Sequence, residues 1–357
     1  MEIRIAKAEA GRMKPKPTDE SKLGFGNIFT DHMFTMKYGQ GRGWHDAVVG
    51  PYQPLVLDPA AMCLHYGQEI FEGLKAYRGG DGSIYLFRPL ENIRRMNSSA
   101  RRLCMPELEE DTALEALKQL VLLEKDWIPR GIGTSLYIRP TMIATEPALG
   151  VRPSAEYLFY IIVGPVGAYY PQGFSPTKIF VTKDYVRAVR GGIGACKAAG
   201  NYASSLLASK SAGLMGYTQV LWLDALELKN VEEVGTSNIF FVIGDELITP
   251  PLTGSILPGV TRDSVIQIAR HQGMRVSERS ISIDEIIAAI SSGRLKEAFA
   301  SGTAAIVSPV GQLYYEGDEY RINDGQTGPI TEKLYYEILN IQYGKTEDPF
   351  GWRIRLG

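Results

Sequence analysis

Residues 191–202 read Gly191-Gly192-Ile193-Gly194-Ala195-Cys196-Lys197-Ala198-Ala199-Gly200-Asn201-Tyr202. They place one lysine, Lys197, in a loop of small residues directly ahead of a helix that Asn201 is expected to cap and that runs to about Met215. Because its neighbours are too small to fill the space around the lysine, another group is expected to occupy that volume. A lysine so placed, with the phenol of Tyr202 close behind it, suits covalent capture of an aldehyde cofactor.

Two other interpretations of Lys197 stay open at this point. Spacing alone is typical of a solvent-exposed loop lysine, because an ammonium group is strongly hydrated. A phosphate-binding P-loop is a weak alternative, because that motif needs Gly-Lys-Ser/Thr, whereas Cys196 precedes this lysine and Ala198 follows it. A nucleophilic amine must be partly neutral, which requires burial to lower its pKa from about 10.4.

The composition is that of an ordinary globular protein. At 357 residues the chain exceeds the roughly 100–200 of one domain, so two domains are expected. A net charge of −2 argues against a nucleic-acid or anionic-membrane partner. The three cysteines and four histidines are scattered, so neither a disulfide framework nor a metal site is expected. The sequence shows neither a secretory signal nor a run of about 20 apolar residues, so a cytoplasmic location is expected.

The predicted elements mix strands, helices and hairpins. Strands are expected at 83–87, 135–139, 156–163, 178–182, 218–224, 238–243 and 246–249, and helices at 113–128, 260–271 and 283–290, with another opened by Pro89. Hairpins are expected to turn at Gly244-Asp245 and at Glu316-Gly317-Asp318. This mixture predicts an α+β or mixed α/β architecture rather than a doubly wound parallel sheet.

Two segments of small residues could hold an anion. Pro258-Gly259-Val260-Thr261 leads into a helix, whose free backbone amides favour a phosphate, together with the hydroxyl of Thr261. Ser301-Gly302-Thr303-Ala304-Ala305 forms a turn of similar capacity. An ordinary helix start and an ordinary turn are equally consistent with these sequences.

Taken together, the motifs resemble those of branched-chain amino acid aminotransferases. The likeness rests on Lys197-x-x-Gly200-Asn201-Tyr202, Glu233-Val-Gly-Thr236, Leu257-Pro-Gly-Val260-Thr261-Arg262 and Ser301-Gly-Thr303-Ala304, in this order. Four upstream segments match as well: Phe25-Gly-x-x-Phe29-Thr-Asp31-His32-Met33, Tyr66-Gly-x-x-x-Phe71-Glu72-Gly73-x-Lys75-Ala76, Phe87-Arg-Pro89-x-x-Asn92-x-x-Arg95-Met96 and Tyr137-Ile-Arg139-Pro-Thr141-x-x-x-Thr145-Glu-Pro147-x-Leu149-Gly-Val151. The likeness runs from about residue 22 to the C-terminus.

The resemblance implies a fold-type IV pyridoxal-phosphate enzyme of mixed α/β architecture. An N-terminal arm (1–22) would precede a small α/β domain (23–166). A short interdomain loop (167–176) would join it to a larger pseudo-barrel domain that binds pyridoxal 5'-phosphate (177–357). Members of the family are homodimers whose site lies between the small and the large domain, so a homodimer is expected.

The resemblance also assigns cofactor-binding residues. Lys197 would be the catalytic residue, holding the cofactor covalently and moving the substrate's α-proton. Glu233 would pair with the pyridine nitrogen, although spacing alone does not distinguish it from Glu227 and Glu232. Arg95 would grip the phosphate, chosen over the adjacent Arg94 by the register of its motif. The other cofactor-binding residues implied are Tyr202, Thr236, Val260, Thr261 and Thr303.

The expected substrate pocket must accept both an isobutyl group and the propionate of glutamate. Arg139 would meet glutamate's distal carboxylate, and the backbone amides around Ala304 and Ala305 would bind the α-carboxylate. Leu149 and Val151 would reach in from the partner subunit. The apolar wall would come from Phe25, Tyr66, Phe71, Tyr137 and Tyr169, with Tyr170 as the alternative to the last.

The implied activity is reversible, ping-pong transamination of leucine, isoleucine or valine with 2-oxoglutarate, giving branched 2-oxo acids and L-glutamate. Mammalian members carry a Cys-x-x-Cys after Thr303-Ala304, where this chain has Ala305 and Ser308, so a bacterial type without a thiol switch is expected. Two alternatives share the fold, a D-amino-acid transaminase and an aminodeoxychorismate lyase. A third, a phosphate- or nucleotide-binding module without chemistry, predicts a colourless protein.

Overall fold

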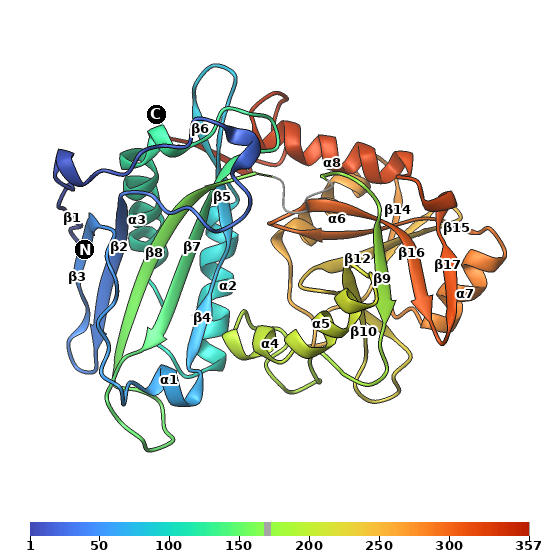
Figure 1. Ribbon diagram of the computed structural model, residues 1–357, viewed down its shortest axis with the longest axis horizontal. Coiled ribbons are helices and arrows are strands. Elements are labelled where there is room, and N and C mark those ends of the chain that lie inside the picture. The colour runs from blue at the N-terminus through green and yellow to red at the C-terminus, as the bar shows by residue number, and fades with distance from the viewer. Residues whose placement is uncertain (168–172, 357) are drawn as a thin grey trace. The chain divides into compact units, whose positions relative to one another are not determined.

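A computed structural model describes residues 1–167 and 173–356 and groups them into two compact units (Figure 1). The first unit contains residues 1–167, 196–199 and 340–356, and the second contains 173–195 and 200–339. The expected interdomain loop, 167–176, falls partly outside the described residues. The grouping differs from the expected boundary at its other edges, because residues 196–199 and 340–356 pack with the first unit.

Sheet pairing explains both of these additions to the first unit. Ala198 forms an isolated antiparallel bridge with Ile70, which attaches the segment that carries Lys197. At the C-terminus, strand β18 (Arg353–Arg355) pairs antiparallel with β6 (Ile84–Phe87). Neither pairing follows from local sequence, since each joins segments far apart in the chain.

The first unit is built on one nine-stranded sheet. Its strands follow the order β1-β3-β2-β8-β7-β5-β6-β18, and β4 also pairs with β7. β1 runs parallel to β3, and the other neighbours are antiparallel. The remaining bounds are β1 (Arg4–Ile5), β2 (His32–Gly39), β3 (Gly43–Pro51), β4 (Glu69–Phe71), β5 (Leu74–Arg78), β7 (Ser135–Ala144) and β8 (Glu156–Val166).

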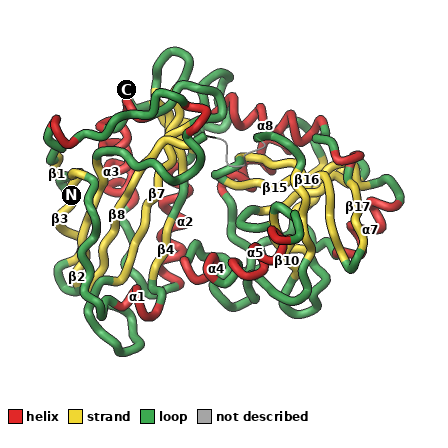
Figure 2. The backbone as a smooth tube through the Cα atoms, viewed as in Figure 1, coloured by secondary structure: helices red, strands yellow, loops and turns green. Residues whose placement is uncertain are grey.

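Two amphipathic helices cover one face of this sheet (Figure 2). Helix α2 (Pro89–Arg102) begins at Pro89, as predicted, and packs against α3 (Glu110–Leu123) and β4. The predicted helix at 113–128 is α3 followed by the short 3-10 turn η3 (Lys125–Trp127). Apolar side chains fill the layer between helices and sheet, among them Phe34, Met36, Leu117, Leu120, Phe159 and Ile161.

The second unit contains another nine-stranded sheet, of mixed direction. Its order is β11-β10-β9-β16-β15-β12-β13-β14, with β17 added beside β16. The hairpins predicted at Gly244-Asp245 and Glu316-Gly317 are confirmed, as β12–β13 and β16–β17. The bounds are β9 (Thr177–Val181), β10 (Gln219–Leu223), β11 (Val231–Val234), β12 (Asn238–Ile243), β13 (Glu246–Thr249), β14 (Arg275–Glu278), β15 (Leu295–Gly302), β16 (Ile306–Tyr315) and β17 (Asp318–Arg321).

Helices pack on this second sheet. Helix α6 (Val260–His271) has the predicted bounds, and α7 (Ile283–Ser291) extends one residue beyond its prediction. Both pack against β15, α5 (Leu206–Leu214) packs against β10, and α8 (Pro329–Gln342) lies near the C-terminus. A core of mostly Ile, Leu and Val side chains, including Ile179, Leu221, Phe241, Ile286 and Leu313, fills the interior.

The helix expected from Asn201 to about Met215 is wrong in its start and its continuity. Asn201 lies inside a short helix, α4 (Ala199–Ala203), and its Nδ2 donates to the carbonyl of Ile193 at 2.9 Å instead of capping. The hydroxyls of Ser204 and Ser205 donate to the carbonyls of Asn201 and Tyr202. Serine side chains that bond nearby carbonyls compete with the next helical turn, so the chain restarts as α5.

Across residues 1–167 and 173–356, none of the helices combines the length and the apolar character that crossing a membrane requires.

Candidate active site

Lys197 lies in a loop immediately before α4, as predicted, and its backbone is bound to two other elements of the first unit. Its amide N–H donates to the hydroxyl of Ser99 on α2 at 3.0 Å. Its carbonyl accepts the amide of Phe71 on β4 at 3.0 Å. With the Ile70–Ala198 bridge, these bonds fix the position of the lysine relative to the sheet.

The Lys197 amine is held in a poorly solvated environment. Its Nζ lies 5.0 Å from the centre of the Phe71 ring. Burial, and secondarily the positive charge of Arg95, lower the pKa of this amine to about 8. A substantial neutral fraction therefore exists near neutral pH, as a nucleophilic lysine requires. The alternative of an exposed loop lysine is inconsistent with this environment.

Arg95 forms a bidentate ion pair with Glu72 inside the first unit. Its Nε and Nη2 lie 2.7 Å from the two carboxylate oxygens of Glu72, and the side chains are 9% and 1% exposed. Burial would raise the pKa of Glu72, but the charge and hydrogen bonds of Arg95 outweigh it, so the pKa falls below its ordinary value. Asn92, one turn earlier on α2, donates to the same carboxylate at 2.8 Å.

The helix separates Arg95 from Arg94, which sequence periodicity does not. Asn92, Arg95 and Ser99 repeat at helical spacing, and Ser99 donates to the carbonyl of Arg95 at 3.1 Å. Arg94 points away, where it pairs with Glu91 and Glu110 in exposed salt bridges. Arg95 is thus the arginine on the Lys197 side of the helix.

Aromatic residues and an arginine line the sheet near Lys197. The guanidinium carbon of Arg139 lies 4.6 Å from the centre of the Phe71 ring, and its Nη2 donates to the hydroxyl of Tyr137 at 3.0 Å. Phe25 meets the Tyr137 ring edge-on at 5.0 Å. A Cβ at Gly73 would come within 2.1 Å of the Tyr137 oxygen, so only glycine lets that phenol lie over the strand.

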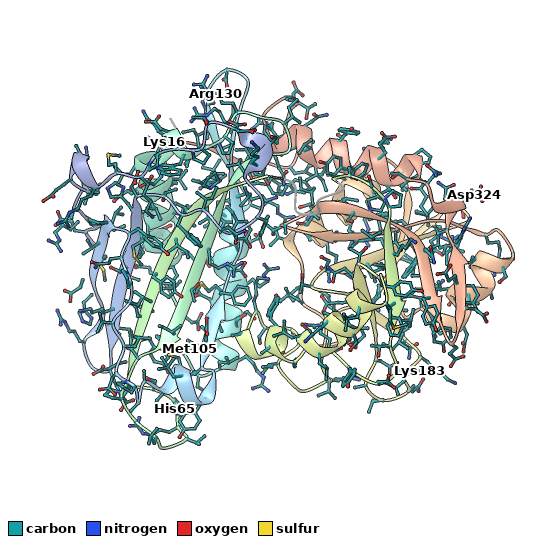
Figure 3. The ribbon with its side chains drawn as sticks, viewed as in Figure 1. Lys16, His65, Met105, Arg130, Lys183 and Asp324 are labelled. Atoms are coloured by element: carbon teal, nitrogen blue, oxygen red, sulfur yellow. The ribbon has the colours of Figure 1, made fainter. Side chains whose placement is uncertain are left out.

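Tyr66 and two apolar loop residues occupy the end of the same unit. Tyr66 ends α1 (Met62–Tyr66), beside His65 (Figure 3), and its hydroxyl donates to the carbonyl of Leu149. Leu149 and Val151 are 65% and 85% exposed. The predicted residue Tyr169, like its alternative Tyr170, lies outside the described residues.

In the second unit, Glu233 is a buried anion. It lies on β11, 2% exposed, and its Oε2 is 2.5 Å from Nη2 of Arg187. Its other oxygen accepts the side-chain amide of Asn238 at 3.3 Å. Of the three carboxylates that spacing did not distinguish, Glu227 is exposed and Glu232, like Glu233, is buried. Burial raises the pKa of Glu232, which accepts the hydroxyl of Ser255.

Three predicted cofactor residues of the second unit share one small cavity. Tyr202, Glu233 and Thr236 line it, together with Arg187, Asn201, Ser205, Gly235 and Leu257. Arg187 also donates to the carbonyls of Gly194 and Ser255. A Cβ at Gly194 would come within 2.2 Å of the Ser255 carbonyl oxygen, so this glycine allows the lysine loop to approach the 255 segment.

Both predicted anion-binding turns have the expected local form. Val260 and Thr261 begin α6, and no side chain caps the helix at Gly259. Thr303, Ala304 and Ala305 form the turn between β15 and β16. Ile306 after this turn has a φ of 63°, a conformation that β-branched residues rarely adopt and that is typical of functional sites.

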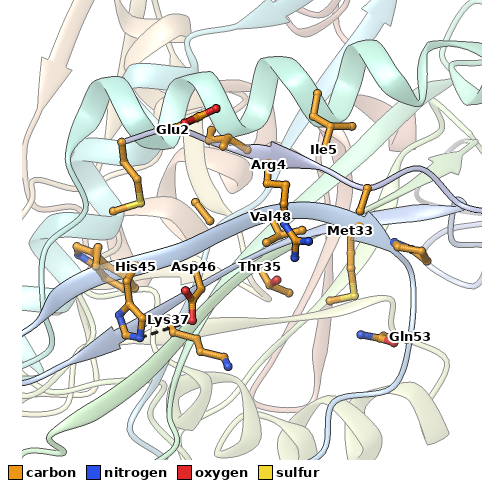
Figure 4. Close-up of a pocket in the computed structure, with 17 residues that line it drawn as sticks. Glu2, Arg4, Ile5, Met33, Thr35, Lys37, His45, Asp46, Val48 and Gln53 are labelled. Atoms are coloured by element: carbon orange, nitrogen blue, oxygen red, sulfur yellow. Dashed lines mark ion pairs between the residues drawn. The ribbon is translucent and has the colours of Figure 1, made fainter.

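Sequence reasoning missed two charged residues of these clusters, Arg187 and the role of Glu72. No spacing rule signals either, since each acts on a partner brought close by the fold. The large groove of the first unit holds none of the predicted site residues. It measures about 1170 Å³ and lies between β1 and strands β2 and β3 (Figure 4).

Comparison with known proteins identifies the family. Residues 69–313 match the class IV aminotransferase model. Branched-chain-amino-acid aminotransferase 2 of Bacillus subtilis strain 168 is 56% identical over 339 residues, covering 95% of this chain and 93% of its own. The chain belongs to the branched-chain amino acid aminotransferase family. Its cofactor is pyridoxal 5'-phosphate, and its fold is the fold-type IV architecture.

Two solved structures give the same result. The branched-chain amino acid aminotransferase of Escherichia coli shares 29% identity with a TM-score of 0.73, covering 91% of this chain and 99% of its own. The branched-chain amino acid aminotransferase of T.th., solved with pyridoxamine 5'-phosphate, shares 27% identity with a TM-score of 0.75, covering 91% of this chain and 98% of its own. The family contains the predicted motifs, and the alternative of a binding module without chemistry is excluded.

Proposed function

We propose that this aminotransferase reversibly transfers the amino group of leucine, isoleucine or valine to 2-oxoglutarate in two half-reactions at one site. The observation that carries the proposal is the Lys197 amine, bound to α2 and β4 through its backbone and with a pKa of about 8. Relatives such as transaminase 1 of Bacillus subtilis, 55% identical over 344 residues, are named for branched-chain amino acids.

The residues present fit pyridoxal 5'-phosphate. When bound, it supplies an aldehyde for the amino group and an electron-accepting ring for the carbanion at the α-carbon. Lys197 would hold the cofactor and then carry the α-proton on its freed amine. Glu233, kept anionic by Arg187, would hydrogen-bond the pyridine nitrogen and keep it protonated. Tyr202 would donate to the phenolic oxygen.

We assign phosphate binding to Arg95, Thr303, the Val260 and Thr261 amides, and Thr236 nearby. The support is the type of donor: an arginine, a helix N-terminus and a tight turn all suit a phosphate. Arg95 is already bound to Glu72, so phosphate binding by its guanidinium would share the donors of that pair.

We assign substrate binding to the aromatic face of the first unit and to the turn at Ala304 and Ala305. Phe25, Phe71 and Tyr137 would contact the branched side chain, and Arg139 would meet the distal carboxylate of glutamate. The amides of the turn would take the α-carboxylate. The same face thus offers both an apolar surface and a cation, as two dissimilar substrates require.

We also propose a homodimer, in which Leu149 and Val151 contribute to the partner's pocket with Tyr66. Both apolar side chains are largely exposed in a single chain, and Tyr66 holds their loop through the Leu149 carbonyl. Analytical ultracentrifugation should give twice the mass of one chain. A monomer that retains full activity would contradict this assignment.

Activity assays test the function. The purified enzyme should be yellow and should transaminate L-leucine but not D-alanine with 2-oxoglutarate. Lys197→Ala should abolish both half-reactions, whereas Lys333→Ala, at an exposed position on α8, should leave them intact. Activity with D-alanine alone, or pyruvate release from aminodeoxychorismate, would favour the alternatives. Full activity of Lys197→Ala would refute the proposal.

A further inference from the structure

The face of the first sheet that carries Arg139 also carries an acidic residue, Glu69. In the antiparallel register Glu69 opposes Ile143, and Phe71 opposes Thr141. Directly opposed residues share a face, and side chains alternate along each strand. Glu69, Phe71 and Arg139 therefore project from the same face, at the end of the sheet where β4 meets α1 (Figure 1).

Arg139 retains hydrogen-bonding capacity on this face. Its guanidinium lies over Phe71 at 4.6 Å and donates through Nη2 to Tyr137. Its Nε is buried and has no hydrogen-bond partner among the described residues. A buried donor without a partner is costly, so a carboxylate placed here would meet an arginine ready to bind it.

Glu69 lies within electrostatic reach of Arg139 without contacting it. Among residues 1–167 and 173–356, its half-buried carboxylate forms neither a hydrogen bond nor an ion pair. Burial raises the pKa of Glu69, and the positive charge of Arg139 partly offsets that rise. The carboxylate is thus poorly solvated and lacks the close cation that usually compensates such burial.

The other titratable groups around Glu69 do not neutralise it. Tyr160 faces it from β8 and Cys63 from α1, and Glu69 contributes to the raised pKa of both. Lys197, bonded through its backbone to Phe71, is the next cation along β4. Any second carboxylate brought to Arg139 would therefore experience the negative charge of Glu69.

We propose that Glu69 is a specificity-determining residue, whose carboxylate competes with a substrate's distal carboxylate for the positive charge of Arg139. It weakens binding of dicarboxylates such as glutamate and leaves branched aliphatic substrates unaffected. The inference rests on the proposed function, in which Arg139 receives the distal carboxylate. Neutral side chains carry no charge for Glu69 to repel, so the effect is confined to one of the two half-reactions.

The test compares half-reactions of the holoenzyme with L-glutamate and L-leucine, each followed separately by the cofactor spectrum. Glu69→Gln should tighten apparent glutamate affinity roughly three- to tenfold, the effect of one partly screened charge pair. The leucine constants and the maximal rates should stay within about twofold. Glu156→Gln removes the same charge at an exposed position on β8 and should change neither.

A pH series adds a readout that a structural role would not change. For the unmodified enzyme, apparent glutamate affinity should fall as pH rises through the titration of Glu69, above the ordinary glutamate range, and Glu69→Gln should remove that fall. Unchanged or weakened glutamate binding in Glu69→Gln, or an equal change for leucine, would overturn the proposal.

Arg139→Met separates this proposal from the one beneath it. If glutamate binding weakens in Arg139→Met but does not respond to Glu69→Gln, the Glu69 assignment alone fails. If Arg139→Met leaves glutamate binding unchanged, Arg139 does not receive the distal carboxylate and both assignments fail. An enzyme that does not transaminate glutamate at all refutes the proposed function itself.

Discussion

Nη2 of Arg187 lies 2.5 Å from Oε2 of Glu233, and the two side chains are 8% and 3% exposed. A buried carboxylate without a cation takes up a proton or destabilises the fold. Arg187 therefore keeps Glu233 ionised, which is the state in which it could hold a pyridinium N–H. Removing either partner leaves the other buried and uncompensated.

Replacing Arg187 should destabilise the enzyme. For Arg187→Gln we expect the free energy of unfolding to fall by about 3–5 kcal/mol, the usual cost of breaking a buried pair. Urea denaturation of the cofactor-free protein measures this, and Arg190→Gln, an exposed neighbour, is the control. An unchanged denaturation midpoint in Arg187→Gln would show that the ion pair contributes nothing to stability.

Cofactor loading should depend on pH through Lys197. Its pKa of about 8 lies below the ordinary 10.5 of lysine, so the amine is protonated and unreactive below pH 8 and neutral above it. The rate at which cofactor-free enzyme binds pyridoxal 5'-phosphate should rise with pH and level off above about 8. Stopped-flow absorbance measures this rate. A rate that still rises toward pH 10.5 would contradict the lowered pKa.

Two adjacent arginines on α2 should differ in their effect on cofactor affinity. Arg95→Lys should weaken binding of pyridoxal 5'-phosphate about tenfold or more, because lysine cannot replace a bidentate guanidinium. Arg94→Lys should have little effect, since Arg94 lies in exposed salt bridges on the other side of the helix. Equilibrium dialysis measures both, and equal losses in the two variants would refute the assignment to Arg95.

Asp31 should hold the N-terminal arm. Its carboxylate accepts the amide of Lys14 at 2.7 Å and the indole N–H of Trp127 at 2.9 Å. Asp31→Ala leaves both donors without this acceptor and should cost about 1–3 kcal/mol of stability. Limited trypsin digestion should then cleave the arm faster at Arg12 and Lys14. Cleavage at the rate of the unmodified enzyme would show that the arm is held by other contacts.

Local sequence was sufficient where short-range interactions decide structure. The bounds of α6, the start of α2 and the two hairpins follow from apolar spacing, a first-turn proline and turn residues, all within a few positions of one another. The strand predicted at 135–139 is longer than expected. β7 continues through Pro140 to Ala144, because the proline lies where β4 and β5 separate and needs no ladder donor there.

The sequence by itself determined the family and the position of Lys197, because motif order and residue type survive without coordinates. Tertiary structure alone decided that Arg95 binds Glu72, that Glu233 binds Arg187, and that Glu69 shares a face with Arg139. Each of these pairs joins different elements, and their contact depends on strand order and register. Burial then sets their charges, because desolvation acts on a side chain only after the chain has folded around it.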